Sequence, residues 1–230
     1  MKPIYIPSGK AKEYGDYAIN IYTGCPHRCY YCFAPAVLRR DRETFYNCVA
    51  PREGIVEAVQ RQLERERITG KTIHLCFTCD PYPTGYDTTA TRGVIKAIKE
   101  SGNHVQILTK GDGRRDFDLL DENDWYGITL DGIESKAPII KRLCSLSEAH
   151  RRGIKTWVSF EPVTNEKMFF EELHSVYTVI DKVKIGKLNY HPSGINWAEF
   201  GRKAESLCRQ LGLDYYIKES LRAAMEAENG

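Results

Sequence analysis

The sequence lacks long apolar runs. No stretch of about 18 consecutive apolar residues, the minimum for a membrane-spanning helix, occurs in its 230 residues. The opening segment, MKPIYIPSGKAKEYGDY, also lacks the apolar core of an export signal. We therefore expect a cytoplasmic protein without a membrane partner, whose cysteines stay reduced.

Strong charge bias, repeats and linkers are absent as well. The net charge is only +2, so composition gives no electrostatic sign of a nucleic-acid or acidic partner. A hydrophobic share of 42% and a charged share of 28% are ordinary for a globular protein. Because no repeat, low-complexity stretch or Ser/Pro/Gly-rich linker divides the chain, we expect one domain over residues 1–230.

Apolar strand-like segments alternate with amphipathic helical segments. Six strands are predicted, over residues 17–22, 72–77, 104–109, 125–130, 155–160 and 179–185. Helices are predicted over residues 54–66, 89–101, 115–120, 139–152, 165–176 and 196–211, and a short extended segment over 214–217 precedes a polar helix over 219–230. This alternation is typical of a parallel sheet. Because a complete barrel needs eight units and about 250 residues, the pattern predicts an α/β fold with a partial, TIM-like (β/α)6 barrel and a mostly parallel sheet.

A cysteine-rich loop follows the first predicted strand, at the end of a strand where such folds carry their chemistry. Cys25, Cys29 and Cys32 have the spacing C-x3-C-x2-C. Three thiolates can hold three irons of a cubane cluster and leave the fourth open, whereas electron-transfer clusters use four cysteines. The spacing therefore indicates a catalytic cluster.

Other interpretations of the cysteines remain open. A zinc site would need four ligands, and His27, Cys48 or the close pair Cys76 and Cys79 could complete it. The three thiols could also be unrelated, although cysteines clustered on a polar loop rarely serve packing alone.

The loop sequence GCPHRCYYCFAP, with an aromatic residue, Tyr31, before the last cysteine, resembles that of the radical SAM superfamily. The resemblance implies a [4Fe–4S] cluster on Cys25, Cys29 and Cys32 that binds S-adenosylmethionine (SAM) through its open iron. It also implies reductive cleavage of SAM to a 5′-deoxyadenosyl radical that abstracts hydrogen from a substrate. A one-electron reductant such as flavodoxin or ferredoxin would be the partner.

The resemblance extends over about residues 15–220, with the cluster loop at 23–34 and a C-terminal tail at 219–230. The stretch CFTCDPYPTGYDTTATRGVIKAIKESGNHVQILTKG is similar to the spore photoproduct lyase-like branch and to small phage-encoded radical SAM-like proteins, and WVSFEPV and YYIKESL are weaker matches. It implies an unidentified substrate that could be a nucleobase or nucleic acid, although no basic patch supports this independently. The alternatives are a non-catalytic module stabilised by zinc or a cluster, and a SAM-dependent transferase that uses the same open iron.

Polar residues after the second, third and fourth predicted strands are candidate contacts to SAM. Asp80 and Thr78 could bind its ammonium or a ribose hydroxyl, and Lys110 could pair with its carboxylate. Asp131 is a weaker candidate. Each also has a structural interpretation, since Asp80 precedes the rigid segment Pro81-Tyr82-Pro83 and Lys110 precedes a glycine.

The resemblance implies two further groups of SAM contacts. Tyr31 and Phe33 would lie against the adenine. Ser159 and Glu161, after the fifth strand, would contact the ribose, although Glu161 before a proline could instead cap a helix or be exposed.

Two cysteines near the end of the second strand bear on the reaction. Spore photoproduct lyases use a cysteine in this region to return hydrogen to the substrate radical, and its aligned position here is Phe77. This departure argues against thymine-dimer repair. Side chains alternate along a strand, so Cys76 and Phe77 are expected on opposite faces, and Cys79 is the better candidate hydrogen donor. His74, inside the same strand, is expected to be buried and hydrogen-bonded, and the charged run 39–42 is expected to face solvent.

Overall fold

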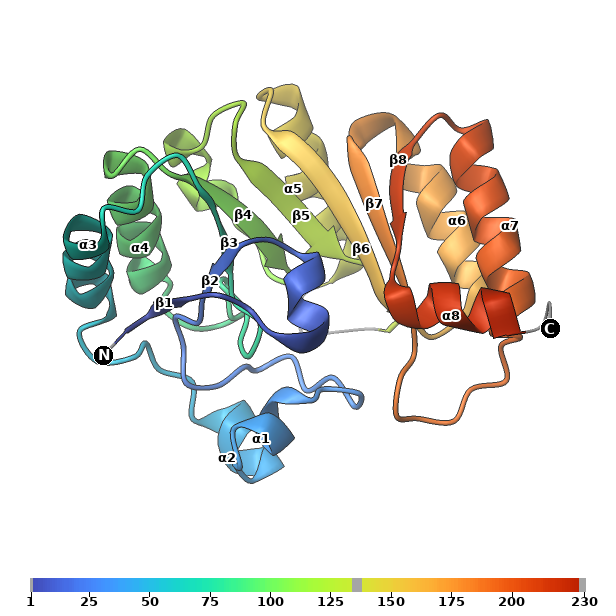
Figure 1. The fold of residues 1–230 in the computed structure, drawn as a ribbon, viewed down its shortest axis with the longest axis horizontal. Helices are drawn as coiled ribbons and strands as arrows, with labels where there is room; N and C mark the ends of the chain where they lie inside the picture. The colour runs from blue at the N-terminus through green and yellow to red at the C-terminus, as the bar shows by residue number, and fades with distance from the viewer. Residues whose placement is uncertain (1, 134–137, 228–230) are drawn as a thin grey trace.

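The computed structural model describes residues 2–133 and 138–227, and the strands in these ranges form one eight-stranded sheet in chain order (Figure 1). The strands are β1 (Ile4–Tyr5), β2 (Tyr17–Ile19), β3 (Thr72–Leu75), β4 (His104–Thr109), β5 (Trp125–Thr129), β6 (Lys155–Val163), β7 (Lys182–Lys187) and β8 (Asp214–Ile217). β1 pairs antiparallel with β2, and the other neighbours are parallel. The predicted partial (β/α) barrel is confirmed, with β2–β7 as its six expected strands.

Helices follow most strands at the predicted positions. They are α1 (Ala34–Val37), α2 (Arg42–Asn47), α3 (Ile55–Glu66), α4 (Thr89–Glu100), α5 (Ile139–Arg151), α6 (Glu166–Val176), α7 (Trp197–Gln210) and α8 (Glu219–Ala227), and the 3-10 turns are η1 (Gly9–Glu13), η2 (Arg114–Leu119) and η3 (Tyr177–Val179). None of these helices has both the length and the apolar composition needed to cross a membrane.

Several expectations need correction. β1, α1 and α2 were not predicted, because such short elements carry no periodicity. The strand predicted at 17–22 ends at Ile19, and the strand predicted at 155–160 continues to Val163, so Ser159 and Glu161 lie within β6 and not after it. The strand predicted at 179–185 begins later, at Lys182, because η3 occupies the preceding apolar residues. The strand predicted at 72–77 ends at Leu75, where Cys76 adopts a positive φ of 71°. The last three residues of the predicted C-terminal helix lie outside the described part of the chain.

The sheet has one apolar face and one polar face. In β4, Val105 and Ile107 are fully buried in the main core, while Gln106 between them is only half-buried. The apolar face packs against the helices, and the opposite face is the concave interior of the partial barrel (Figure 1). Residue pairing between strands places His74, Gln106 and Trp125 on this concave face. His74 is buried and its Nδ1 lies 2.9 Å from Oε1 of Gln106, as expected.

The N-terminal segment crosses the concave face (Figure 1). Tyr14, just after η1, packs its ring against His74, Phe77 and Trp157, with ring centroids 5.2, 5.4 and 6.0 Å away. Its hydroxyl donates a hydrogen bond to Glu161 Oε2. Tyr14, near the start of the chain, therefore covers the middle of the concave face.

Gly127 in β5 makes room for the indole of Trp157, its register partner in β6. A Cβ atom at position 127 would lie far inside van der Waals contact with the indole ring. We therefore expect Gly127→Val to lower the free energy of unfolding by about 1–3 kcal/mol, the usual cost of overpacking a core. Urea denaturation measures this. Gly194→Ala is the control, because a Cβ there meets no atom within 4 Å; equal stability of both variants would contradict this packing.

Candidate active site

The cysteine loop is held against α2 by close backbone packing. Gly24 has no room for a side chain, because a Cβ would collide with the carbonyl oxygen of Phe45. The same carbonyl accepts a hydrogen bond from the Cys25 amide at 3.2 Å. Cys25 and Cys32 pack against a small apolar cluster that contains Phe45 and Tyr46. The short helix α2 is thus a support that fixes the loop.

Charged residues between the cysteines and α2 brace the loop further. The run 39–42 is exposed, as expected. Arg40 nevertheless donates to the carbonyl of Thr23 at 2.8 Å, and Arg42 donates to that of Cys32 at 3.1 Å. Asp41 caps α2 by accepting the Thr44 amide at 2.9 Å. The run therefore satisfies loop carbonyls as well as facing solvent.

The three loop cysteines are free and half-buried. Burial, and next the charge of Asp80, raises the pKa of the Cys25 thiol well above its ordinary value, and burial raises the pKa of Cys32. Among the described residues, the three sulfurs do not all lie within 4.8 Å of one another. Sulfur ligands of a single tetrahedral zinc, at Zn–S of about 2.3 Å, would lie only about 3.8 Å apart.

A buried charge network joins the loop to the carboxyl ends of β4 and β5. The ammonium of Lys110 donates to Asp131 Oδ2, to the Tyr31 hydroxyl at 2.5 Å and to the Cys29 sulfur at 3.1 Å. Burial acts to lower the pKa of Lys110, but Asp131 and Cys29 outweigh it and the pKa is raised. Arg142, also buried, lies 3.9 Å from the other oxygen of Asp131. The predicted residues Tyr31, Lys110 and Asp131 are thus brought together beside Cys29.

Asp80 anchors the loop to the end of β3. One carboxylate oxygen lies 3.2 Å from His27 Nε2 and accepts the Lys110 amide at 2.8 Å, and the other accepts the Tyr82 amide at 2.8 Å and the Thr109 hydroxyl. Burial acts to raise the pKa of Asp80, but His27 and these donors outweigh it, and the pKa is lowered. Both oxygens therefore have protein donors, so the structural interpretation of Asp80 has direct support.

Ser159 and Glu161 belong to a second group of predicted residues, inside the barrel. Ser159 is buried beside Tyr14. Glu161 accepts from the Tyr14 hydroxyl and lies 3.2 Å from the ammonium of Lys218. Gly186 on β7 leaves space for both side chains, since a Cβ there would lie 3.1 Å from Glu161 and from Lys218.

Two other predicted SAM contacts have different surroundings. The Thr78 hydroxyl is buried and has no hydrogen-bond partner among the described residues. Phe33 is 53% exposed at the start of α1. A buried hydroxyl without a partner is a natural contact for a bound polar ligand, whereas the Phe33 ring faces solvent.

Cys76 and Cys79 lie beyond the end of β3. Because the strand ends at Leu75, the alternation expected for Cys76 and Phe77 does not apply. Cys76 is buried, while Cys79 is half-buried and its sulfur accepts the Tyr22 amide at 3.4 Å.

Several residues of the concave interior were not predicted from the sequence. His27 was weighed only as a zinc ligand, and Tyr14, Lys184 and Lys218 were not singled out. The available signal was the alternation K-V-K-I-G-K in β7, which places lysines on one face of a strand in the middle of a parallel sheet.

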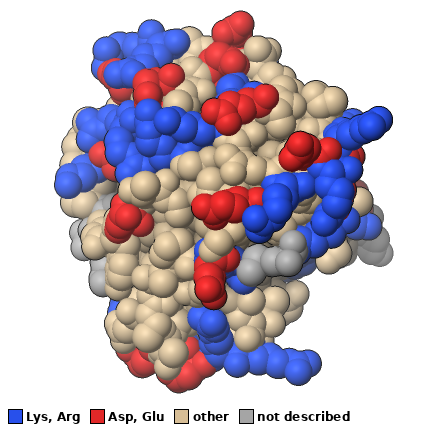
Figure 2. All heavy atoms as spheres, turned by 90° about the vertical axis from the view of Figure 1, so that its left-hand side faces the viewer, with Lys and Arg blue, Asp and Glu red and all other residues tan. Residues whose placement is uncertain are grey.

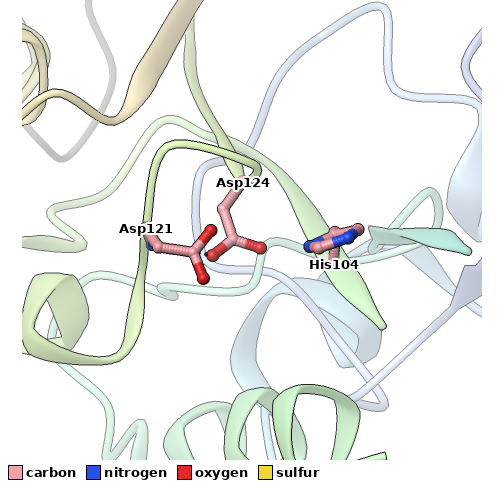
Figure 3. Close-up of side chains that lie close together, drawn as sticks. All are labelled: His104, Asp121 and Asp124. Atoms are coloured by element: carbon pink, nitrogen blue, oxygen red, sulfur yellow. Dashed lines mark hydrogen bonds between the residues drawn. The ribbon is translucent and has the colours of Figure 1, made fainter. Parts of the chain in front are cut away.

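A separate cluster of metal-ligand types lies at the other end of β4, where His104, Asp121 and Asp124 approach one another (Figure 3). Lys99 neutralises both carboxylates, with N–O distances of 2.7 and 2.6 Å. Asp124 also accepts the Val105 amide at 2.8 Å. These carboxylates pair with Lys99 and accept hydrogen bonds from backbone amides, which accounts for the cluster without an ion.

The face that carries α3 and α4 mixes charges of both signs (Figure 2). Arg65 pairs with Glu66 at 2.9 Å, and Arg92 pairs with Asp118 at 2.6 Å. Acidic groups lie among the basic ones throughout this face, in keeping with a net charge of +2. It is not the uniform basic surface that binding to a phosphate backbone favours.

The sequence profile of the radical SAM superfamily matches residues 19–163, which contain the cysteine loop and the strand ends described above. An uncharacterized protein of Mycobacterium tuberculosis, Rv2578c, is 32% identical over 123 residues, covering 51% of this chain and 36% of that protein. An uncharacterized protein of Methanocaldococcus jannaschii, MJ0683, is 29% identical over 178 residues, covering 71% of this chain and 64% of that protein. The chain thus spans about a third of the mycobacterial relative and under two thirds of the archaeal one.

Solved structures share the fold at low identity. A spore photoproduct lyase variant with bound AdoMet and dinucleoside spore photoproduct has a TM-score of 0.71 and 13% identity, covering 93% of this chain and 79% of that one. SuiB of Streptococcus suis bound to S-adenosylmethionine has a TM-score of 0.69 and 11% identity, covering 90% of this chain and 51% of that one. These similarities show the partial-barrel fold.

The Lys110–Asp131 pair predicts a large loss of stability when one partner is removed. Asp131→Ala would leave Lys110 and the neighbouring Arg142 as buried cations, so we expect the free energy of unfolding to fall by about 3–5 kcal/mol. The double variant Lys110→Met/Asp131→Leu removes the central charges together and should lose less. Urea denaturation of both variants tests this, and a double variant that is less stable than Asp131→Ala would refute it.

Proposed function

Because the chain belongs to the radical SAM superfamily, we propose that it is a radical SAM enzyme whose [4Fe–4S] cluster is held by Cys25, Cys29 and Cys32. The cofactors of this superfamily are a [4Fe–4S] cluster and SAM. When bound, the cluster supplies the electron that cleaves SAM. The activity, substrate and partners proposed below refer to the whole protein, of which this chain can be a part.

The observation that carries the proposal is the set of three free thiols on one braced loop at the carboxyl edge of the sheet. Their spacing is wider than one zinc ion accommodates, and three sulfur ligands suit a cluster with one open iron. The donor set therefore fits the group that the family requires. It does not favour the alternative of a zinc-stabilised binding module.

The chain's own residues would hold, orient and shield this site. The ammonium of Lys110 lies 3.1 Å from the Cys29 sulfur, where it would stabilise a thiolate ligand by a charge-assisted hydrogen bond. Asp80 and His27 hold the loop against the end of β3. Thr78, Ser159 and Glu161 face the same interior and are our proposed contacts to the ribose and ammonium of SAM. Tyr31 and Phe33 remain our proposed contacts to its adenine, and for Phe33 this needs a change from its exposed position.

A nucleobase or nucleic acid is the substrate class that we propose, with a flavodoxin or ferredoxin in the cytoplasm as reductant. The support is the shared fold with a spore photoproduct lyase variant that binds a dinucleoside photoproduct. SuiB, which shares the fold equally well, has been solved bound to a precursor peptide. The fold therefore accommodates both classes.

The first test is anaerobic reconstitution of the full chain with iron and sulfide, followed by addition of SAM and dithionite. We expect about four irons per chain, and 5′-deoxyadenosine as the product. The variant Cys25→Ala/Cys29→Ala/Cys32→Ala should lose both. Cys144→Ala, at an exposed cysteine on α5, is the matched control that should retain both.

Other outcomes would replace the proposal. One zinc per chain and no SAM cleavage would indicate the binding module. Consumption of SAM with products other than 5′-deoxyadenosine and methionine would indicate the transferase.

Cys79 is our proposed hydrogen donor, because its sulfur is half-buried and it precedes Asp80, which contacts His27 of the cysteine loop. Once a substrate is known, Cys79→Ala should reduce the yield of repaired or rearranged product while 5′-deoxyadenosine is still formed. Cys208→Ala, at a buried cysteine in α7, should leave the yield unchanged. An undiminished yield in Cys79→Ala would eliminate this role.

A further inference from the structure

A cavity lies at the amino ends of the strands, opposite the cysteine loop. Its volume is about 360 Å³, within the size range of small-molecule sites. The sheet contributes residues from the first three positions of β4–β8, and the segment after η1 closes one side. The lining residues include Lys12, Gln106, Trp125, Trp157, Lys182 and Lys184. None of them belongs to the cysteine site, so this cavity is independent of the proposed function.

Lys184 is a buried cation without an anionic partner. Only 6% of it is exposed, and its ammonium donates to the backbone oxygen of Glu13 at 2.7 Å. Among residues 2–133 and 138–227, no carboxylate lies within ion-pair distance of it. The nearby carboxylates of Glu13 and Glu161 pair instead with Lys218, at 3.6 and 3.2 Å. The charge of Lys184 is met instead by the Glu13 carbonyl and by the rings of Tyr14, Trp157 and Tyr216, whose centroids lie 4.2, 5.4 and 5.8 Å away, and not by an anion.

The surrounding charges reinforce this imbalance. Burial, and next the charges of Lys218 and Lys182, lowers the pKa of Lys184 to about 8. Lys12 is exposed at the rim, while Lys182 pairs with Asp214 at 2.9 Å. An incoming anion would relieve the repulsion among these lysines, which is the electrostatic condition for anion binding.

Aromatic and amide groups line the rest of the cavity. Trp125 offers a partly exposed indole, and behind it the buried Trp157 is fixed by a hydrogen bond from its Nε1 to the Ile107 carbonyl at 2.9 Å. Gln106 uses its Oε1 for His74, which leaves its amide nitrogen for a ligand. Planar rings bind well to such aromatic walls.

We propose that this cavity binds a small aromatic anion of mononucleotide size, with its phosphate against Lys184 and Lys182 and its ring against Trp125. The site would recognise a free nucleotide rather than a nucleotide within a chain, because the cavity is closed on one side by the Tyr14 segment.

Isothermal titration calorimetry of the full chain with cytidine 5′-monophosphate tests the proposal. We expect a Kd of about 1 mM or tighter at pH 7, and at least about tenfold weaker binding of inorganic phosphate and of cytidine. Tryptophan fluorescence should be quenched, since two of the three tryptophans line the cavity. Equal affinity for phosphate alone, or for cytidine alone, would overturn the proposed aromatic anion.

Lys184→Met should weaken binding of cytidine 5′-monophosphate by at least about tenfold, as expected for removal of a buried charge from the interface. Lys167→Met, at a lysine that is 85% exposed on α6, should bind as the parent does. Lys184→Met also removes the hydrogen bond to the Glu13 carbonyl and the contacts with three aromatic rings, so urea denaturation is measured alongside to show that the variant is folded. A folded Lys184→Met that binds with unchanged affinity would refute the proposal.

The pH dependence gives a separate readout. Raising the pH from 7 to 9.5 neutralises Lys184, so affinity should fall over this window in the parent and stay flat in Lys184→Met. The base of cytidine 5′-monophosphate does not titrate there. The other charged or titratable groups that face Lys184 are Glu13, Tyr14, His74, Glu161, Lys182, Tyr216 and Lys218. A parallel loss of affinity in parent and variant would assign the effect to one of these and overturn the role of Lys184.

Discussion

The alternation of side chains along the parallel strands is the constraint on which the rest of the structure depends. One face of the sheet is apolar and buried under helices, so alternate residues must point into the concave interior. In this chain those residues include His74, Gln106 and Lys184 rather than the branched apolar residues that fill a closed barrel. The interior is therefore a polar chamber whose charges must be balanced locally or by a ligand.

Those charges are balanced in different ways along the interior. At the carboxyl edge, Lys110 and Asp131 neutralise each other beside the cysteine loop. In the middle, Glu161 is shared between Tyr14 and Lys218. At the amino edge, Lys184 has no carboxylate partner among the described residues and lies against aromatic rings and a carbonyl. The two ends of the interior thus differ, because one holds an ion pair beside sulfur ligands and the other holds a cation without an anion.

The sequence predicted the fold and the cysteine loop well, for identifiable reasons. Strand and helix periodicity located β2–β7 and the helices between them to within a few residues, because each buries an apolar face in the core. The cysteines were found because their spacing is itself the signal. Tyr14 and Lys218 could not be found this way, since their contacts join segments more than 140 residues apart. The donors to Asp80 come from its own turn, at Tyr82, and from Thr109 and Lys110 at the end of β4, and no sequence pattern joins these two segments.

The placement of Tyr14 has a consequence for how the chain reaches its final form. The segment that carries it is made first, yet its partners Trp157, Glu161 and Lys218 are made much later. Contacts of such long sequence separation form late, because the intervening chain must be ordered first. During synthesis the strands of the barrel would therefore assemble first. The segment that carries Tyr14, although it is made before its partners, would dock last onto the concave face.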